Sequence, residues 1–172
     1  GKRNSIVNIR YYAYEPIDPQ KEYLPKDVSR RVDNSVFWNE LFNQLRRQLL
    51  GKLSKYRVPV INNLLPQEQL RSEFFRIAAE YAQDENSLFI VAIDGIDHAA
   101  RANVSENTFL SALPNPEYLP ENVKIVIAGQ PKEDYRNYPE WLFNNEMGYV
   151  KEIHVPSILK SDIYSLVENK FP

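Results

Sequence analysis

The feature that most constrains the fold is a pair of short segments that are almost continuously apolar. Residues 88–93 read LFIVAI, and residues 123–128 read VKIVIA. A strand with one solvated face alternates apolar and polar side chains, whereas a strand covered on both faces by helices does not. We therefore expect both segments to be buried strands of a parallel sheet that carries helices on both faces.

Residues 5–14 (SIVNIRYYAY) are dense in β-branched and aromatic side chains and stop just before Pro16, which predicts another strand. The next stretch, residues 16–32, has three prolines and no periodicity, and we expect it to be a surface loop. A shorter strand is expected at residues 149–155, and a final helix is expected to start at Ser161.

Two amphipathic helices are expected between the first two strands. Apolar residues recur at helical spacing from Phe37 to Leu49, after the possible caps Asn34 or Ser35. Gly51 supplies a stop for this helix. The second helix is expected from Pro66 to near Asp84, because proline suits a first helical position. Strands separated by helices are typical of a doubly wound α/β domain.

The amino-acid composition argues against several kinds of partner and site but does not identify a function. A chain of 172 residues with 43% hydrophobic residues is long enough for one globular core. Its 21 basic and 23 acidic residues nearly cancel, so the charge balance favours neither nucleic acid nor an anionic membrane as a partner. Without cysteine there is no thiolate metal site or cysteine nucleophile, and the cytoplasm is the expected compartment. The longest apolar run is too short to cross a membrane.

Candidate chemistry lies where the first of the apolar segments ends, in the residues Asp94, Gly95, Asp97 and His98. In open parallel sheets, ligands bind beyond the carboxyl ends of the strands. A carboxylate at Asp94 can hold Mg²⁺, which takes one or two carboxylates together with water and phosphate oxygens. Asp97 would order or deprotonate an attacking water, with His98 beside it. The alternative is structural, with Asp94 and Gly95 forming a turn and Asp97 capping the following helix.

Residues 90–98 (IVAIDGIDH) resemble the acidic strand of the STAND/NACHT branch of P-loop NTPases, which reads as four apolar residues, Asp, Gly or Ala, an apolar residue, Asp, then Glu or His. Residues 10–16 look like that family's strand after the phosphate-loop helix, and residues 119–131 look like its next core strand. Residues 153–171 are similar to the stretch that leads into its helical lid.

The resemblance implies a three-layer P-loop NTPase core with a parallel sheet, incomplete on its N-terminal side. The core would span residues 1–155, with the Walker B strand at 88–94 and the sensor strand at 123–128, and the lid would begin at 156–172. ATP and Mg²⁺ are the implied cofactors, with Asp94 at the metal. Gln130 takes the sensor position, where the family often has Arg, so it would bring a hydrogen bond but no charge.

A phosphate-binding loop is absent from the sequence. Such a loop needs several glycines, a Lys and a Ser or Thr. The pairs Gly1-Lys2 and Gly51-Lys52 are followed by Arg3 and Leu53, and neither has an earlier partner glycine. We therefore expect the chain to be part of a larger protein and to hydrolyse no ATP by itself.

The family resemblance implies a signalling ATPase in which ATP–Mg²⁺ binding and hydrolysis control oligomerisation and effector activation in defence or immunity. The partners implied are ATP, further copies through the NTPase domain, and effector and sensor domains of the same parent chain. Two alternatives stay open at this point. One is a non-catalytic α/β protein-interaction domain, and the other is a hydrolase or phosphotransfer domain that uses its paired carboxylates with Mg²⁺ directly.

Overall fold

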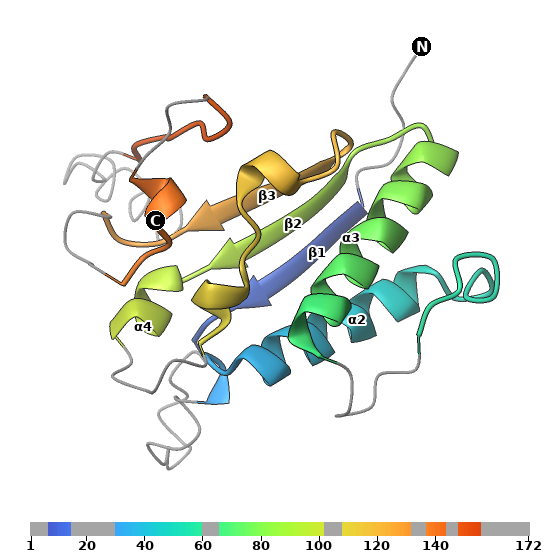
Figure 1. Cartoon of the computed structure of the whole chain (residues 1–172), viewed down its shortest axis with the longest axis horizontal. Coiled ribbons are helices and arrows are strands. Elements are labelled where there is room, and N and C mark those ends of the chain that lie inside the picture. The colour runs from blue at the N-terminus through green and yellow to red at the C-terminus, as the bar shows by residue number, and fades with distance from the viewer. Residues whose placement is uncertain are drawn as a thin grey trace, which may run out of the picture.

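Three parallel strands form the centre of the molecule (Figure 1). The computed structural model describes residues 7–14, 30–59, 66–101, 108–131, 137–143 and 148–155. Its strands are β1 (Val7–Tyr12), β2 (Phe89–Asp94) and β3 (Val123–Ala128), and they lie side by side in that order. The pairing brings Asp94 level with Tyr12 on one side and with Ala128 on the other. The predicted α/β fold with a parallel sheet is thereby confirmed.

Helix α2 (Asn34–Gln48) follows the predicted apolar periodicity, but its cap differs from the prediction. The Asp33 carboxylate accepts hydrogen bonds from the backbone N–H groups of Ser35 and Val36, so Asp33 is the N-cap. An oxygen in that place satisfies donors that have no partner within the helix. The predicted caps Asn34 and Ser35 are therefore wrong by one or two residues, and both lie inside the helix.

Helix α3 (Gln67–Asp84) begins directly after Pro66, one residue later than predicted, and ends where expected. The connection from β2 to β3 contains a short helix and two 3₁₀ turns, and a further 3₁₀ turn follows β3. These are α4 (Ile96–Arg101), η1 (Phe109–Ala112), η2 (Pro116–Tyr118) and η4 (Glu140–Leu142).

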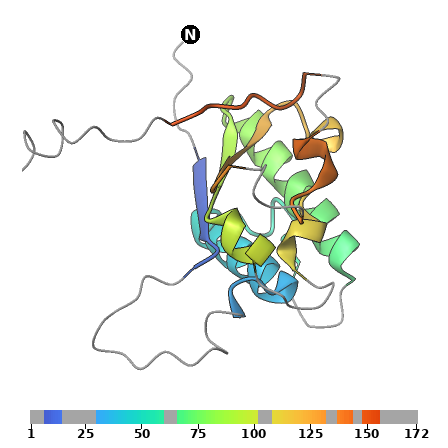
Figure 2. The same ribbon diagram turned by 90° about the vertical axis from the view of Figure 1, so that its left-hand side faces the viewer.

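The hydrophobic core lies on one face of the sheet. Figure 2 shows α2 and α3 on the same side of the three strands. There Tyr11 meets the α2 residue Phe37 edge-on, with ring centroids 4.8 Å apart, and Phe37 in turn stacks on Phe109 of η1. Trp38 packs against Phe74 of α3 and is 1% exposed. Aromatic side chains thus hold the two helices against the sheet.

The opposite face of the sheet lacks the helical layer that the sequence predicts, within the part of the chain that the structure describes. Along β2, buried residues alternate with half-buried ones. On the half-buried side, Val126 is 54% exposed and Tyr12 is 42% exposed. The described residues therefore show two layers, the sheet and one layer of helices, and the third layer stays a prediction. The apolar side chains of this face are the reason that the sequence predicted a second cover.

The strand predicted at residues 149–155 is absent from the structure. The described residues 148–155 form irregular chain, in which Ile153 is 75% exposed and Val155 is 81% exposed. Most of the loop predicted at 16–32, the helix predicted from Ser161 and the lid predicted at 156–172 lie outside the described residues.

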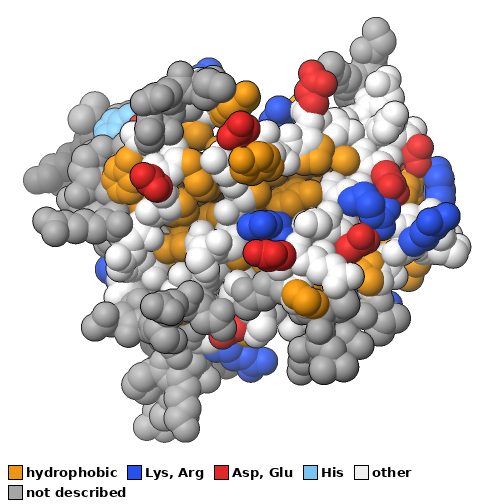
Figure 3. Space-filling model, in the orientation of Figure 1, with side chains coloured by type: hydrophobic (Ala, Val, Ile, Leu, Met, Phe, Trp, Pro, Cys, Tyr) orange, Lys and Arg blue, Asp and Glu red, His pale blue; other side chains and the backbone are white. Residues whose placement is uncertain are grey.

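The surface carries charges of both signs. Figure 3 shows Lys and Arg side chains interspersed with Asp and Glu side chains on the face seen in Figure 1, with hydrophobic side chains visible between them.

Among the described residues, none of the helices combines the length and apolar character needed to span a bilayer.

Candidate functional site

Asp94 is the last residue of the middle strand, and the backbone fixes its place from both sides. Its carbonyl oxygen accepts a hydrogen bond from the Ala13 N–H at 2.9 Å. The N–H of the next residue, Gly95, donates to the Ala128 carbonyl, also at 2.9 Å. Gly95 has a φ of +76°, and the chain turns there directly into α4. The carboxylate predicted to hold a metal therefore stands at the carboxyl edge of the sheet, where parallel sheets bind ligands.

Tyr14 closes over this turn from the end of β1. Its hydroxyl donates to Oδ2 of Asp94 over 3.5 Å, a long hydrogen bond, and its ring stacks on His98 with centroids 5.1 Å apart. A Cβ added at Gly95 would lie 2.6 Å from Cδ1 of Tyr14. Only glycine leaves room for the ring, since side-chain atoms do not approach that closely.

The electrostatics of the pair keep Tyr14 a hydrogen-bond donor. The negative charge of Asp94 is the main reason that the pKa of the Tyr14 hydroxyl is raised. A protonated phenol donates, so it occupies Oδ2 of Asp94. No hydrogen bond to Oδ1 of Asp94 is found among the described residues. The carboxylate therefore has one oxygen held by Tyr14 and one available to a ligand.

Asp97 has a partner within its own helix. Its side chain is 6% exposed and forms an ion pair with Arg101, one turn further along α4. Nε2 of His98 lies 4.0 Å from Oδ2 of the same carboxylate. Asp97 is the second residue of the helix, so the prediction that it caps α4 is wrong. The pairing compensates a buried charge, which would otherwise be costly.

Gln130 lies two residues beyond β3 and is exposed. Its backbone carbonyl accepts a hydrogen bond from the Tyr138 hydroxyl at 3.1 Å. The preceding Gly129 sits beside α4, since a Cβ there would lie 3.4 Å from the backbone nitrogen of Asp97. Gln130 therefore follows directly on the segment that packs against the start of α4, on the same edge of the sheet as Asp94.

The donor chemistry of this edge fits Mg²⁺ in one respect. Nowhere in the described ranges do three or more His, Asp or Glu side chains gather as a metal-binding group. Mg²⁺ does not need such a group, because it keeps several waters and is held by one or two carboxylates and substrate phosphates. The free oxygen of Asp94 meets that smaller requirement, whereas the carboxylate of Asp97 is engaged by Arg101.

Sequence reasoning identified Asp94, Asp97, His98 and Gln130, and missed the contact that Tyr14 makes with Asp94. The available signal was the place of Tyr14, just after a strand that runs parallel to β2 and ends at the same edge.

Comparison with known proteins yields no relative: the chain matches no family model, and neither a curated protein nor a solved structure is similar to it.

Proposed function

We propose that the chain is part of a nucleotide-dependent signalling ATPase of the STAND/NACHT class of P-loop NTPases. The observation that carries the proposal is the place of Asp94. It ends the central strand of a parallel sheet, beside a glycine turn into a helix, and one of its carboxylate oxygens has no hydrogen bond among the described residues. Ligands of open parallel sheets bind at this edge, and a carboxylate there suits Mg²⁺.

The sheet has room for the strand that a phosphate loop requires. Because β2 is flanked by β1 and β3, a further strand has to join at an outer edge. On β3 the outward backbone groups belong to Ile125 and Ile127, because Ala128 and the other even-numbered residues face β2. In the described part of the chain, the outward groups of these two isoleucines have no hydrogen-bond partner. A strand added there would be separated from β2, the strand that ends at Asp94, by β3 alone.

Each residue of the edge has a role in this proposal. Asp94 would hold Mg²⁺, whose charge would offset that of the ATP phosphates. Gln130 would hydrogen-bond the terminal phosphate or its water. Asp97 and His98 were expected to act on the attacking water. Since Asp97 is buried and paired with Arg101, we propose that it steadies α4 and that any contact with water goes through the more exposed His98.

The wider role follows from the family resemblance and is part of the proposal. ATP–Mg²⁺ binding would promote assembly of several copies through the NTPase domain, in the cytoplasm, and this assembly would switch an effector in defence or immunity. Effector and sensor domains would belong to the same parent chain. The 172 residues alone would neither bind ATP tightly nor hydrolyse it, because the phosphate loop that supplies most contacts is not among them.

A direct test compares the full-length parent protein with its Asp94→Ala variant in Mg²⁺-dependent ATP hydrolysis and in nucleotide binding. We expect the variant to lose turnover while it keeps most of its nucleotide affinity. Asn43→Ala, on the exposed side of α2, serves as the control and should leave both unchanged. A wild-type parent that neither binds nor hydrolyses ATP would refute the proposal.

One observation favours a second candidate, a non-catalytic interaction domain. The sheet face opposite the helices presents Tyr12 and Val126 to solvent in the described structure. Exposed apolar side chains on a sheet are a feature of binding surfaces. In that case Asp94 would only end a strand, and its substitution would alter partner binding or stability but no ATPase activity.

A further inference from the structure

The outer edge of β1 is occupied by side chains. In a parallel strand, the backbone groups of alternate residues point to opposite neighbours. The Ala13 N–H bonds to β2, so the odd-numbered residues of this segment face β2, and Arg10 and Tyr12 face outward. An outer strand normally leaves such groups open, and open groups pair readily with another strand.

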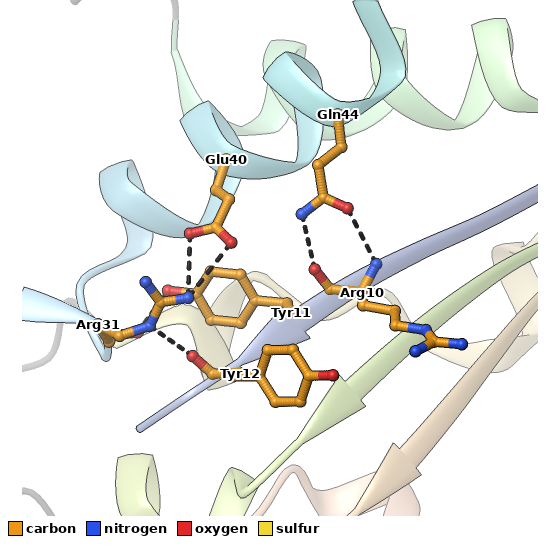
Figure 4. A network of polar contacts seen from close by, with 6 residues as sticks. All are labelled: Arg10, Tyr11, Tyr12, Arg31, Glu40 and Gln44. Atoms are coloured by element: carbon orange, nitrogen blue, oxygen red, sulfur yellow. Dashed lines mark hydrogen bonds and ion pairs between the residues drawn. The ribbon is translucent and has the colours of Figure 1, made fainter. Parts of the chain in front are cut away.

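Gln44 of α2 binds both outward groups of Arg10 (Figure 4). The Arg10 N–H donates to Oε1 of Gln44 at 3.0 Å, and Nε2 of Gln44 donates to the Arg10 carbonyl at 2.6 Å. A side-chain amide has the same donor and acceptor as a peptide group. Gln44 therefore makes the two hydrogen bonds that a neighbouring strand would make to this residue.

Arg31 binds the backbone carbonyl of the next outward-facing residue, Tyr12. Its Nε donates to the Tyr12 carbonyl at 2.6 Å, and its Nη2 bonds to both oxygens of Glu40 at 3.1 and 3.2 Å. The Tyr11 hydroxyl donates to the backbone carbonyl of Arg31 at 2.5 Å. Arg31 is thus fixed by three groups, from β1 and from α2, and Figure 4 shows it lying beside the strand.

We propose that Gln44 and Arg31 close the β1 edge to strand pairing with a second copy of the chain. A strand approaching β1 would have to displace three hydrogen bonds from Arg10 and Tyr12 before making its own. The inference is independent of nucleotide binding and holds under either candidate function.

The test is amide hydrogen exchange of Arg10 in the 172-residue chain, measured over a range of protein concentrations. In the wild type, the Arg10 amide should exchange slowly at every concentration. In Gln44→Ala it should exchange about fivefold to tenfold faster when dilute, the factor expected for loss of one hydrogen bond. It should slow again as the concentration rises, because the backbone groups of Arg10 that Gln44 has released then pair with those of a second copy. The control is Asn43→Ala, which removes a side-chain amide from the neighbouring exposed position of α2. In this variant the Arg10 amide should exchange as in the wild type.

Gln44→Glu tests whether the hydrogen bond to the Arg10 N–H, and not burial of Arg10 by the side chain, protects this amide. It also replaces Gln44→Ala as the test if that variant fails to fold. Its carboxylate still accepts from the Arg10 N–H but no longer donates to the Arg10 carbonyl, so the Arg10 amide should stay protected. An Arg10 amide in dilute Gln44→Ala that exchanges as slowly as in the wild type would overturn the proposal. So would an amide that stays fast at all concentrations, or one that is unprotected in Gln44→Glu.

Discussion

Replacing Gly95 by alanine tests whether the turn at Asp94 is held by the Tyr14 ring. Two separate costs follow from the geometry. The φ of +76° is unfavourable for any residue with a Cβ, by about 1–2 kcal/mol. The new Cβ would also lie 2.6 Å from Cδ1 of Tyr14, and overpacking of this kind costs about 1–3 kcal/mol. We expect Gly95→Ala to lower the free energy of unfolding by about 2–5 kcal/mol, the sum of the two costs.

The matched control is Gly51→Ala. Gly51 has a similar φ of +85°, but a Cβ added there meets nothing within 4 Å. This variant should therefore lose only the backbone part, about 1–2 kcal/mol. Equilibrium unfolding in urea measures both. A third variant, Gly95→Ala with Tyr14→Ala, should lose less than the sum of its two single changes, because the clash is gone. Equal losses for Gly95→Ala and Gly51→Ala would refute the reasoning.

Three other substitutions probe interactions away from the turn. Arg101→Ala leaves the buried Asp97 carboxylate without its main ion pair and should cost about 1–3 kcal/mol in thermal or urea unfolding, whereas Arg101→Ala in an Asp97→Asn background should cost clearly less. Trp38→Phe should cost at least about 2 kcal/mol less than Trp38→Ala, because truncating a buried Trp to Ala costs about 3–5 kcal/mol, and Nε1 of Trp38 has no hydrogen bond to lose in the described structure. Hydrogen bonding from Lys55 lowers the pKa of Asp84, so the stabilisation is present above the ordinary Asp pKa of about 3.9 and is lost as the pH falls through the lower folded-state pKa. Urea unfolding from pH 7 to pH 2 should accordingly show a gap between wild type and Lys55→Ala that narrows below about pH 4, and a gap that stays constant would contradict this assignment.

The sequence predicted the helices and the central strand well because their apolar patterns record burial directly. The periodicity from Phe37 to Leu49 places α2, and the buried residues of this helix belong to that pattern, apart from Asn34. The continuous run at residues 88–93 marks β2. The same run also predicts a second helical layer, which the described residues do not supply, because apolar side chains indicate a need for cover and not which segment provides it.

The missed features depend on which segments the fold brings together. Tyr14 meets Asp94 only because the register sets Tyr12 opposite Asp94, with a separation of 80 residues between the bonded pair. Gln44 reads in the sequence as an ordinary polar residue of an amphipathic helix, yet it completes the edge of β1. Strand-edge contacts of this kind have no local sequence signature, and neither does the cap at Asp33, which has an equally suitable neighbour in Asn34.

The central claim, that Asp94 belongs to a nucleotide–metal site, is tested most directly by locating the metal. Crystals of the full-length parent grown with Mn²⁺ and a non-hydrolysable ATP analogue would give the metal position from its anomalous signal. We expect Mn²⁺ beside the Asp94 carboxylate, bound directly or through one water, and bridged to the nucleotide phosphates. Nucleotide and metal bound elsewhere, with Asp94 contacted only by Tyr14, would contradict it.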